Sequence, residues 1–444
     1  MMQAVSMSTT SCVARTTVTG KATAKPIHLS ALRSPVVALR PKARRATFGR
    51  ASLHCNAVAA PALPREPINM DSVVLSGLEG KPLTIHSWPT KSELLGCIPK
   101  ECFKKDTTKS MMYAAISSAL TLGCGALAYY TIPMTAAYWP VWIAYGFVNG
   151  TIATGCWVVA HECGHNAFSN NKTLQDAVGY VLHSLLLVPY FSWQRSHAVH
   201  HAKTNHVTEG ETHVPHVSHG GEGTSSQRRK ELLGAPLYGV LRLFTHLGFG
   251  WPAYLLTGAT GGPLRGKTNH FLPFMGNQGE HKLFPGQWAG KVWTSDVGIV
   301  AAVAGLWYWA SVAGASQVAL LYGLPYMGVN LWLVLYTWLQ HTDTDIPHYA
   351  ADEWNFIKGA LCTVDRPYGA LLNFLHHGIG STHVAHHVNS AIPHYNAWKA
   401  TAAIKEAFPE HYLYDPTPII PAMWRVATQC IAVQKNGDRY VFQN

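Results

Sequence analysis

The sequence predicts an all-α integral membrane protein with four transmembrane helices in two hairpins, additional interfacial helices and a histidine-rich metal domain on one aqueous face. The first observation is composition: of 444 residues, 48% are hydrophobic and 13% are charged, against roughly 25% charged in soluble globular proteins. The second is a pair of long apolar segments in each of two regions, 111–160 and 294–340. The third is a set of histidine motifs that lie outside these segments.

The N-terminal 60 residues differ from the rest of the chain. They contain nine Lys and Arg and no Asp or Glu, so they account for nine of the eleven net positive charges. Abundant Ser, Thr and Ala without a continuous apolar core predict a disordered organelle transit peptide. No strong amphipathic Arg helix stands out, which favours a chloroplast over a mitochondrial address; a disordered cytosolic tail is the alternative. The remaining chain has no basic groove or RNA-reading motif, which excludes nucleic acid as a partner.

An N-terminal segment, 61–110, follows the transit peptide. Its basic and apolar stretch at 94–109 is suited to lying at a membrane surface. The first hairpin occupies 111–160. Its two apolar runs, 111–132 and 134–160, are each long enough to cross a bilayer, and Pro133 lies at the turn between them.

The second hairpin occupies 294–340, with apolar runs at 297–315 and 318–339 that are rich in Trp, Tyr and Gly, as membrane helices often are. Two further apolar stretches, 178–193 and 237–256, are short or interrupted by His, Arg and Pro. We expect each of these two stretches to form an interfacial helix.

Four crossings constrain where the polar regions lie. Two crossings return the chain to its starting side before 161–293, and two more return it there before 341–444. Both regions therefore share one aqueous face, and an odd number of crossings would separate them.

Three histidine motifs occur in these two regions: HECGH from His161, HAVHH from His197 and HVAHH from His383. In a helix, residues at i, i+3 and i+4 share one face, and neutral imidazole is a common ligand of transition metals. One tetrahedral zinc takes about four ligands, so the motifs predict two metal ions. The candidate ligands are His161, His165, His197, His200, His201, His383, His386 and His387.

The order and separation of these motifs resemble the membrane fatty acid desaturases, a histidine-box family of non-haem di-iron enzymes. Four phrases resemble the plant and algal delta-12 (omega-6) oleate desaturases: AHECGHNAFS at 160–169, VPYFSW at 188–193, THVAHH at 382–387 and IPHY at 392–395. The similarity extends over roughly 99–433.

The resemblance implies two non-haem iron ions bound by the eight motif histidines, with O2 as co-substrate. It implies that an oleoyl chain on a membrane glycerolipid is converted to a linoleoyl chain. Some family members add one further histidine ligand, for which His341 and His377 are the candidates. The chain contains no fused cytochrome b5 segment, so electrons would come from ferredoxin in a plastid or from cytochrome b5 at the endoplasmic reticulum.

Alternatives remain open. The middle of the second motif is Ala-Val, where the plant oleate desaturases usually have charged or polar residues, and the following Asn205-His206-Val207 is reminiscent of omega-3 desaturases acting on linoleoyl chains. Related hydroxylases and epoxygenases can use the same ligands. The delta-12 phrases resemble the endoplasmic-reticulum branch, which makes that membrane the alternative location. A membrane metal transporter predicts ionisable residues within its spans, and 111–132 and 297–315 contain none.

Acidic residues near the motifs are candidates for orienting the imidazole N–H groups. These are Glu162, Glu209, Glu211 and Asp365. An acyl chain also requires an apolar tunnel, for which Trp193, Trp338 and residues of 371–375 are the candidate lining.

Overall fold

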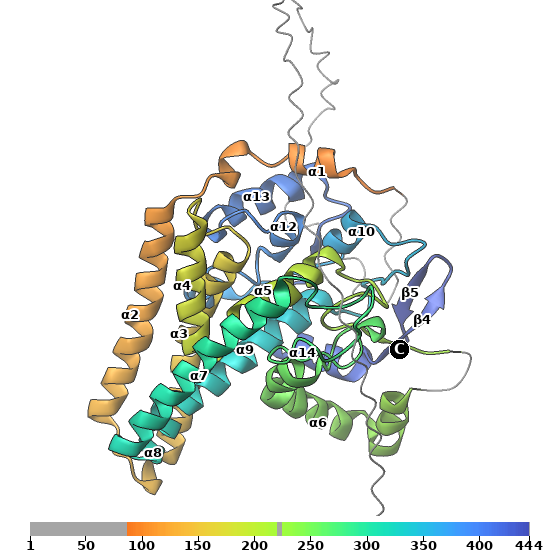
Figure 1. Cartoon of the computed structure of the whole chain (residues 1–444). Helices are drawn as coiled ribbons and strands as arrows, with labels where there is room; N and C mark the ends of the chain where they lie inside the picture. The colour runs from red at the N-terminus through yellow and green to blue at the C-terminus, as the bar shows by residue number, and fades with distance from the viewer. Residues whose placement is uncertain (1–86, 220–223, 444) are drawn as a thin grey trace, which may run out of the picture. The chain divides into compact units, whose positions relative to one another are not determined.

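The computed structural model describes residues 87–219 and 224–443, and this part of the chain is predominantly helical (Figure 1). The predicted transit peptide at 1–60 and the following residues to 86 lie outside the described residues. The chain divides into two units, Met1–Arg65 and Glu66–Asn444, and the description below concerns the second.

Five helical segments in the described residues are long and apolar enough to cross a membrane, one more than the four expected. They are α2 (Thr107–Thr131), α3 (Trp139–Gly164, preceded by the 3-10 turn Ala136–Tyr138), α6 (Ser225–Thr257), α7 (Trp288–Ala313) and the run Ala315–His341. The last run consists of α8 (Ala315–Val318), the π-helical turn η6 (Ala319–Gly323) and α9 (Leu324–His341).

Helix α3 is the centre of the bundle. It runs beside α2 (Figure 1) and also packs against α9 and α4 (Lys172–Leu185). Gly150 of α3 and Gly328 of α9 allow a close approach, because a Cβ at position 150 would lie 2.7 Å from the Cα of Gly328. Small residues at a helix crossing permit this backbone contact in membrane proteins. The crossing places the C-terminal ends of α3 and α9 together.

The outward faces of these helices are apolar. On α2 Leu122 is 73% exposed, and on α7 Val297 is 67% exposed. Large exposed apolar surfaces on soluble monomers are rare, and a lipid environment accounts for them here. The buried core lies on the other side, where Trp157, Leu335 and Val426 belong to one cluster formed by α3, α6, α9 and α14 (Ile419–Gln429).

Two predicted interfacial segments differ from expectation. The stretch at 94–109 is not one element, because α1 (Lys91–Gly96) and a 3-10 turn (Lys100–Phe103) precede α2. The stretch at 178–193 was wrongly predicted as one helix. The chain turns between α4 and α5 (Tyr190–Ala202), where Leu187 has a positive φ of 53° and Pro189 precedes the first residue of α5.

The segment at 237–256 belongs to the longer helix α6. Gly234, with φ of 74°, breaks the helical geometry near its start, and Pro236 and Pro252 lie inside it. Proline removes a helical hydrogen bond and bends the axis.

Short elements complete the histidine-rich side. The helices are α10 (Phe356–Leu361), α11 (Gly369–Leu375), α12 (His383–Val388) and α13 (His394–Ala407), with a 3-10 turn at Pro263–Arg265. The all-α expectation omits two small sheets. The sheets are formed by β1 (His216–Val217), β4 (Ala432–Asn436) and β5 (Arg439–Phe442), and by β2 (Val364–Asp365) with β3 (Leu413–Tyr414). Three of these strands have two residues, too few for an alternating pattern to indicate a strand.

Candidate metal centre

The first motif lies at the end of α3. His161 is in the last helical turn and His165 follows the helix as its C-terminal cap residue. The four-residue spacing brings their Nε2 atoms to 3.2 Å.

The second motif lies on α5, and the ring centroids of its three imidazoles lie 4.7–5.5 Å apart. His197 and His201 approach each other, with their Nε2 atoms 3.3 Å apart. His200 turns toward α9 instead, where its Nε2 lies 3.1 Å from Nε2 of His341. The three rings therefore share one face of α5, as expected, and this face contributes histidines to two groups.

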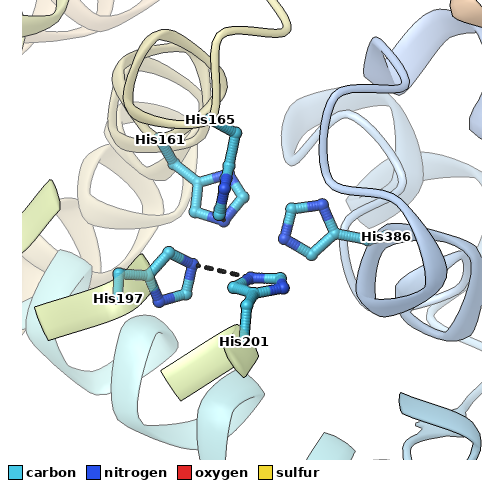
Figure 2. A group of neighbouring side chains, drawn as sticks. All are labelled: His161, His165, His197, His201 and His386. Atoms are coloured by element: carbon cyan, nitrogen blue, oxygen red, sulfur yellow. Dashed lines mark hydrogen bonds between the residues drawn. The ribbon is translucent and has the colours of Figure 1, made fainter. Parts of the chain in front are cut away.

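Two compact groups of histidines result. The five-histidine group has His161 and His165 from the end of α3, His197 and His201 from α5, and His386 from α12 (Figure 2). The three-histidine group consists of His200, His341 and His387. Within each group one ring nitrogen of every member lies within 4.8 Å of the others.

The remaining predicted residue of the third motif, His383, adjoins the three-histidine group, with its Nε2 2.9 Å from Nε2 of His341. The two candidates for an additional ligand are also separated by the structure. His341 is in a group, whereas His377 contacts Ser117 Oγ at 3.0 Å and lies in neither group of the described residues.

The donor set fits a metal in each group. Histidine nitrogens bind a transition metal at about 2.1 Å, so two ligands at a right angle lie about 3 Å apart. Three nitrogen pairs within the groups lie at 3.1–3.3 Å. His386 Nε2 and His387 Nε2 are buried and have no hydrogen-bond partner among the described residues. Such orphaned atoms are rare in native proteins unless an ion or water satisfies them.

Burial keeps the imidazoles neutral. It lowers the pKa of His165, His197 and His201 well below the usual value, and neighbouring imidazoles lower it further. Burial alone lowers the pKa of His200 to about 3. Neutral imidazole, not imidazolium, is the form that ligates a metal.

Hydroxyl groups contact the outer ring nitrogens of the three-histidine group. Thr212 Oγ1 lies 2.9 Å from Nδ1 of His200, and Thr204 Oγ1 lies 3.1 Å from Nδ1 of His387. Such contacts fix the tautomer and orientation of a ligand. Sequence analysis missed both threonines, although each lies within twelve residues of His200.

The four predicted acids have different roles. Glu162 Oε1 lies 3.6 Å from Nδ1 of His161, and Glu162 Oε2 accepts the main-chain N–H of His394 at 2.8 Å. Asp365 accepts the main-chain N–H of Val384 at 2.9 Å, which fixes the start of α12. The other two are paired away from the predicted ligands: Glu209 with Lys203, and Glu211 with Tyr254.

Two adjoining cavities lie in this region, and the smaller one is lined by His197 of the five-histidine group. The outer cavity, of about 830 Å³, is lined by Arg229, His219 and Trp338. The inner pocket is smaller, about 50 Å³, and is lined by His197 and by aromatic residues of α3, α5 and α6. These aromatic residues are Trp157, Trp193, Trp251 and Tyr254. The two cavities share His213, His246 and Thr260.

The lining of these cavities can be compared with the residues predicted to line an acyl-chain tunnel. Of the candidates, Trp193 lines the inner pocket and Trp338 lines the outer cavity. The residues of 371–375 line neither of these two cavities, and Leu371 is 69% exposed. His213, which adjoins both cavities, has a positive φ of 52° and was not singled out from the sequence.

Comparison with known proteins shows similarity to fatty acid desaturases. The family described as fatty acid desaturase matches residues 137–417. A Delta(12) fatty acid desaturase of Mortierella isabellina is 38% identical over 369 residues, 80% of this chain and 90% of that protein. The Delta(12)-fatty-acid desaturase of Arabidopsis thaliana is 39% identical over 355 residues, 78% of this chain and 88% of that protein. The omega-6 fatty acid desaturase, endoplasmic reticulum isozyme 2, of Glycine max is 40% identical over 352 residues, with coverage of 77% and 87%.

Proposed function

The chain belongs to the fatty acid desaturase family, and from this premise we propose that it is a delta-12 (omega-6) desaturase that converts oleoyl to linoleoyl chains. It is an oxidoreductase that introduces a double bond into a lipid acyl chain in a membrane. Relatives bearing the delta-12 or omega-6 name match most of its length at 38–40% identity.

One observation on the structure supports this proposal independently of the family membership. His197 belongs to the five-histidine group and also lines the apolar inner pocket. Apolar space therefore begins directly beside the predicted ligands. The methylene groups of an acyl chain are not acidic, so no side-chain base can activate them, and the difficult chemistry requires a cofactor.

We assign two non-haem irons to the two groups. The proposed ligands are the eight motif histidines and His341. When bound, the iron pair supplies O2-dependent removal of two hydrogens from adjacent carbons. With two electrons and two protons from outside, dioxygen and these hydrogens give two water molecules.

The residues around the pocket position the chain. Trp157 and Trp193 contact the ring of His161 and border the same pocket as His197. Large rigid indoles exclude water and restrict lateral movement of the bound chain. This restriction matters because misplacement by about 1 Å can cost about 10²-fold in rate.

The proximity of histidines from the regions 161–293 and 341–444 also supports four membrane crossings. Four crossings place both regions on one face of the membrane. His200 precedes α6 and His341 follows α9, yet their Nε2 atoms lie 3.1 Å apart. Crossings by α6, α7 and α9 together would leave these residues on opposite sides. Helix α6, with its break at Gly234 and two internal prolines, is best assigned to the interface and not to a fifth crossing.

The acid-free N-terminus supports a chloroplast membrane, with ferredoxin as the electron donor. The relative from Glycine max bears an endoplasmic-reticulum name, so that membrane, with cytochrome b5 as donor, is the alternative. A fluorescent reporter fused to residues 1–60 should enter plastids. Reticular labelling would instead assign the enzyme to the endoplasmic reticulum.

Expression in a host that lacks polyunsaturated lipids tests the reaction. We expect linoleoyl lipids to appear when oleoyl lipids are present. Trienoic product from supplied linoleoyl lipid, with oleoyl lipid unchanged, would identify an omega-3 desaturase. Hydroxylated or epoxidised chains would identify a related hydroxylase or epoxygenase.

A further inference from the structure

The inner pocket is bounded between α6 and α9 by two small residues. Gly250 of α6 and Val334 of α9 both line it. A Cβ at position 250 would lie 3.4 Å from both methyl carbons of Val334. At this point the two helices therefore leave space for about one methyl group in van der Waals contact.

This boundary lies on the membrane side of the ligands. Val334 precedes His341 by seven residues on α9, which corresponds to about 10 Å at 1.5 Å per residue. Trp157, which also lines the pocket, precedes His161 by four residues on α3. The pocket thus extends from the histidines toward the lipid-embedded parts of α3 and α9.

The direction of the bound chain follows from polarity. The outer cavity contains Arg229 and His219, which suit a polar lipid headgroup. The surface of the inner pocket is mostly apolar, although three histidines and three threonines are among its lining residues, and an unpaired polar group would be costly there. The methyl end of the acyl chain therefore occupies the inner pocket.

We propose that Gly250 and Val334 together form the stop for this methyl end and so determine which acyl chains the enzyme accepts. The inference rests on the proposed function. The carbons that react are held beside the ligands, so the distance from the ligands to this stop limits the number of carbons beyond them. A delta-12 double bond leaves five carbons beyond it in an eighteen-carbon chain and three in a sixteen-carbon chain.

Gly248 provides a matched control for Gly250 on the same helix. A Cβ at Gly248 would meet no atom within 4 Å, whereas a Cβ at Gly250 meets Val334. Gly250→Ala and Gly248→Ala make the same chemical change, with the same effect on intrinsic helix propensity. Only the first narrows the inner pocket.

The full chain and its variants are expressed in a host whose membranes contain both palmitoleoyl and oleoyl lipids. The readout is the ratio of sixteen-carbon to eighteen-carbon dienoic product, corrected for the precursor pools, which does not depend on enzyme amount. Gly250→Ala should raise this ratio about tenfold, since one methylene in an apolar pocket changes specificity by about 10–200-fold. Val334→Ile should also raise the ratio, Val334→Ala should lower it, and Gly248→Ala should leave it at the wild-type value.

Wild-type ratios in Gly250→Ala, Val334→Ile and Val334→Ala would overturn the assignment of the stop. An equal rise in Gly248→Ala and Gly250→Ala would overturn it too, because the effect would then belong to the helix and not to the pocket. If Gly250→Ala fails to accumulate, the opposite shifts expected for the two Val334 variants decide the question. Wild-type membranes without any dienoic product would contradict the proposed function instead.

Discussion

Thr204 Oγ1 lies 3.1 Å from Nδ1 of His387, and the same hydroxyl donates its hydrogen to the main-chain oxygen of His200 at 2.7 Å. A hydroxyl has one hydrogen, so towards His387 the oxygen of Thr204 is the acceptor and Nδ1 is the donor. The proton of His387 is thereby held on Nδ1. Its Nε2, which has no partner among the described residues, is left with a free lone pair for a metal.

Removing this hydroxyl should weaken metal binding. Thr204→Val has nearly the same shape but cannot accept the N–H of His387, so we expect a loss of about 10–100-fold in iron affinity or activity. Thr204→Ser keeps the hydroxyl and should remain close to wild type. Iron titration of purified protein measures the effect, and wild-type affinity in Thr204→Val would show that the hydroxyl does not orient the ligand.

His341 and His377 provide a second test. His341 belongs to the three-histidine group, whereas His377 contacts Ser117. His341→Ala should lose the iron of the three-histidine group and turnover, while His377→Ala should keep the full iron content. Metal analysis of the two purified variants separates them. Full iron in His341→Ala together with depleted iron in His377→Ala would reverse the assignment.

The sequence identifies candidate donors but not their grouping. Spacing at i, i+3 and i+4 identifies neighbours on one helix, so the eight motif histidines are candidates from local pattern. Their division depends on which helix each side chain faces, and His200 is directed to α9, which is more than one hundred residues away in the sequence. Local spacing contains no information about that contact.

The secondary structure, too, was predicted only where a local sequence pattern identifies it. Helices α2, α3, α7 and α9 follow from apolar runs long enough to span a bilayer, and they were predicted. The break between α4 and α5 was missed because both sides of it are apolar and pattern alone does not identify an interruption. Thr204 and Thr212 were missed for a related reason, since threonines near a motif become informative only when their distances to the rings are known.

Removing one partner from a buried ion network should strongly destabilise the fold. Arg366 is buried and pairs with Asp343, at 2.8 Å, and with Asp415; Arg425 contacts the same two carboxylates. Arg366→Met leaves one arginine for two buried carboxylates, and we expect a loss of about 3–5 kcal/mol in the free energy of unfolding. Thermal unfolding in detergent measures it.

The exposed pair of Lys172 and Asp176 supplies the control for this network. Its ends lie 2.9 Å apart, and the lysine side chain is 62% exposed. Lys172→Met should change the free energy of unfolding by no more than about 0.5 kcal/mol, as is usual for exposed pairs at this spacing. A similarly small effect of Arg366→Met would show that the buried network does not stabilise the fold.

Glu211 should make stability depend on pH. Its carboxyl group is buried, and Tyr254 Oη donates to Oε2 at 2.5 Å. Burial raises the pKa of Glu211 to about 8, although the Tyr254 hydrogen bond and Arg265 act to lower it. In the unfolded chain the pKa is about 4.3, so between these values the folded state binds a proton that the unfolded state has released.

Stability therefore falls as the pH rises between these two pKa values. The stabilisation from Glu211 is fully present below about pH 4.3 and is lost as the pH rises to about 8, because ionising a buried carboxyl group favours the unfolded state. Glu211→Gln resembles the protonated acid and does not titrate. Relative to wild type, the variant should therefore gain thermal stability steadily from pH 5 to pH 8, measured on the iron-loaded protein in detergent. A constant difference between the two proteins across this range would show that Glu211 titrates alike in the folded and unfolded states.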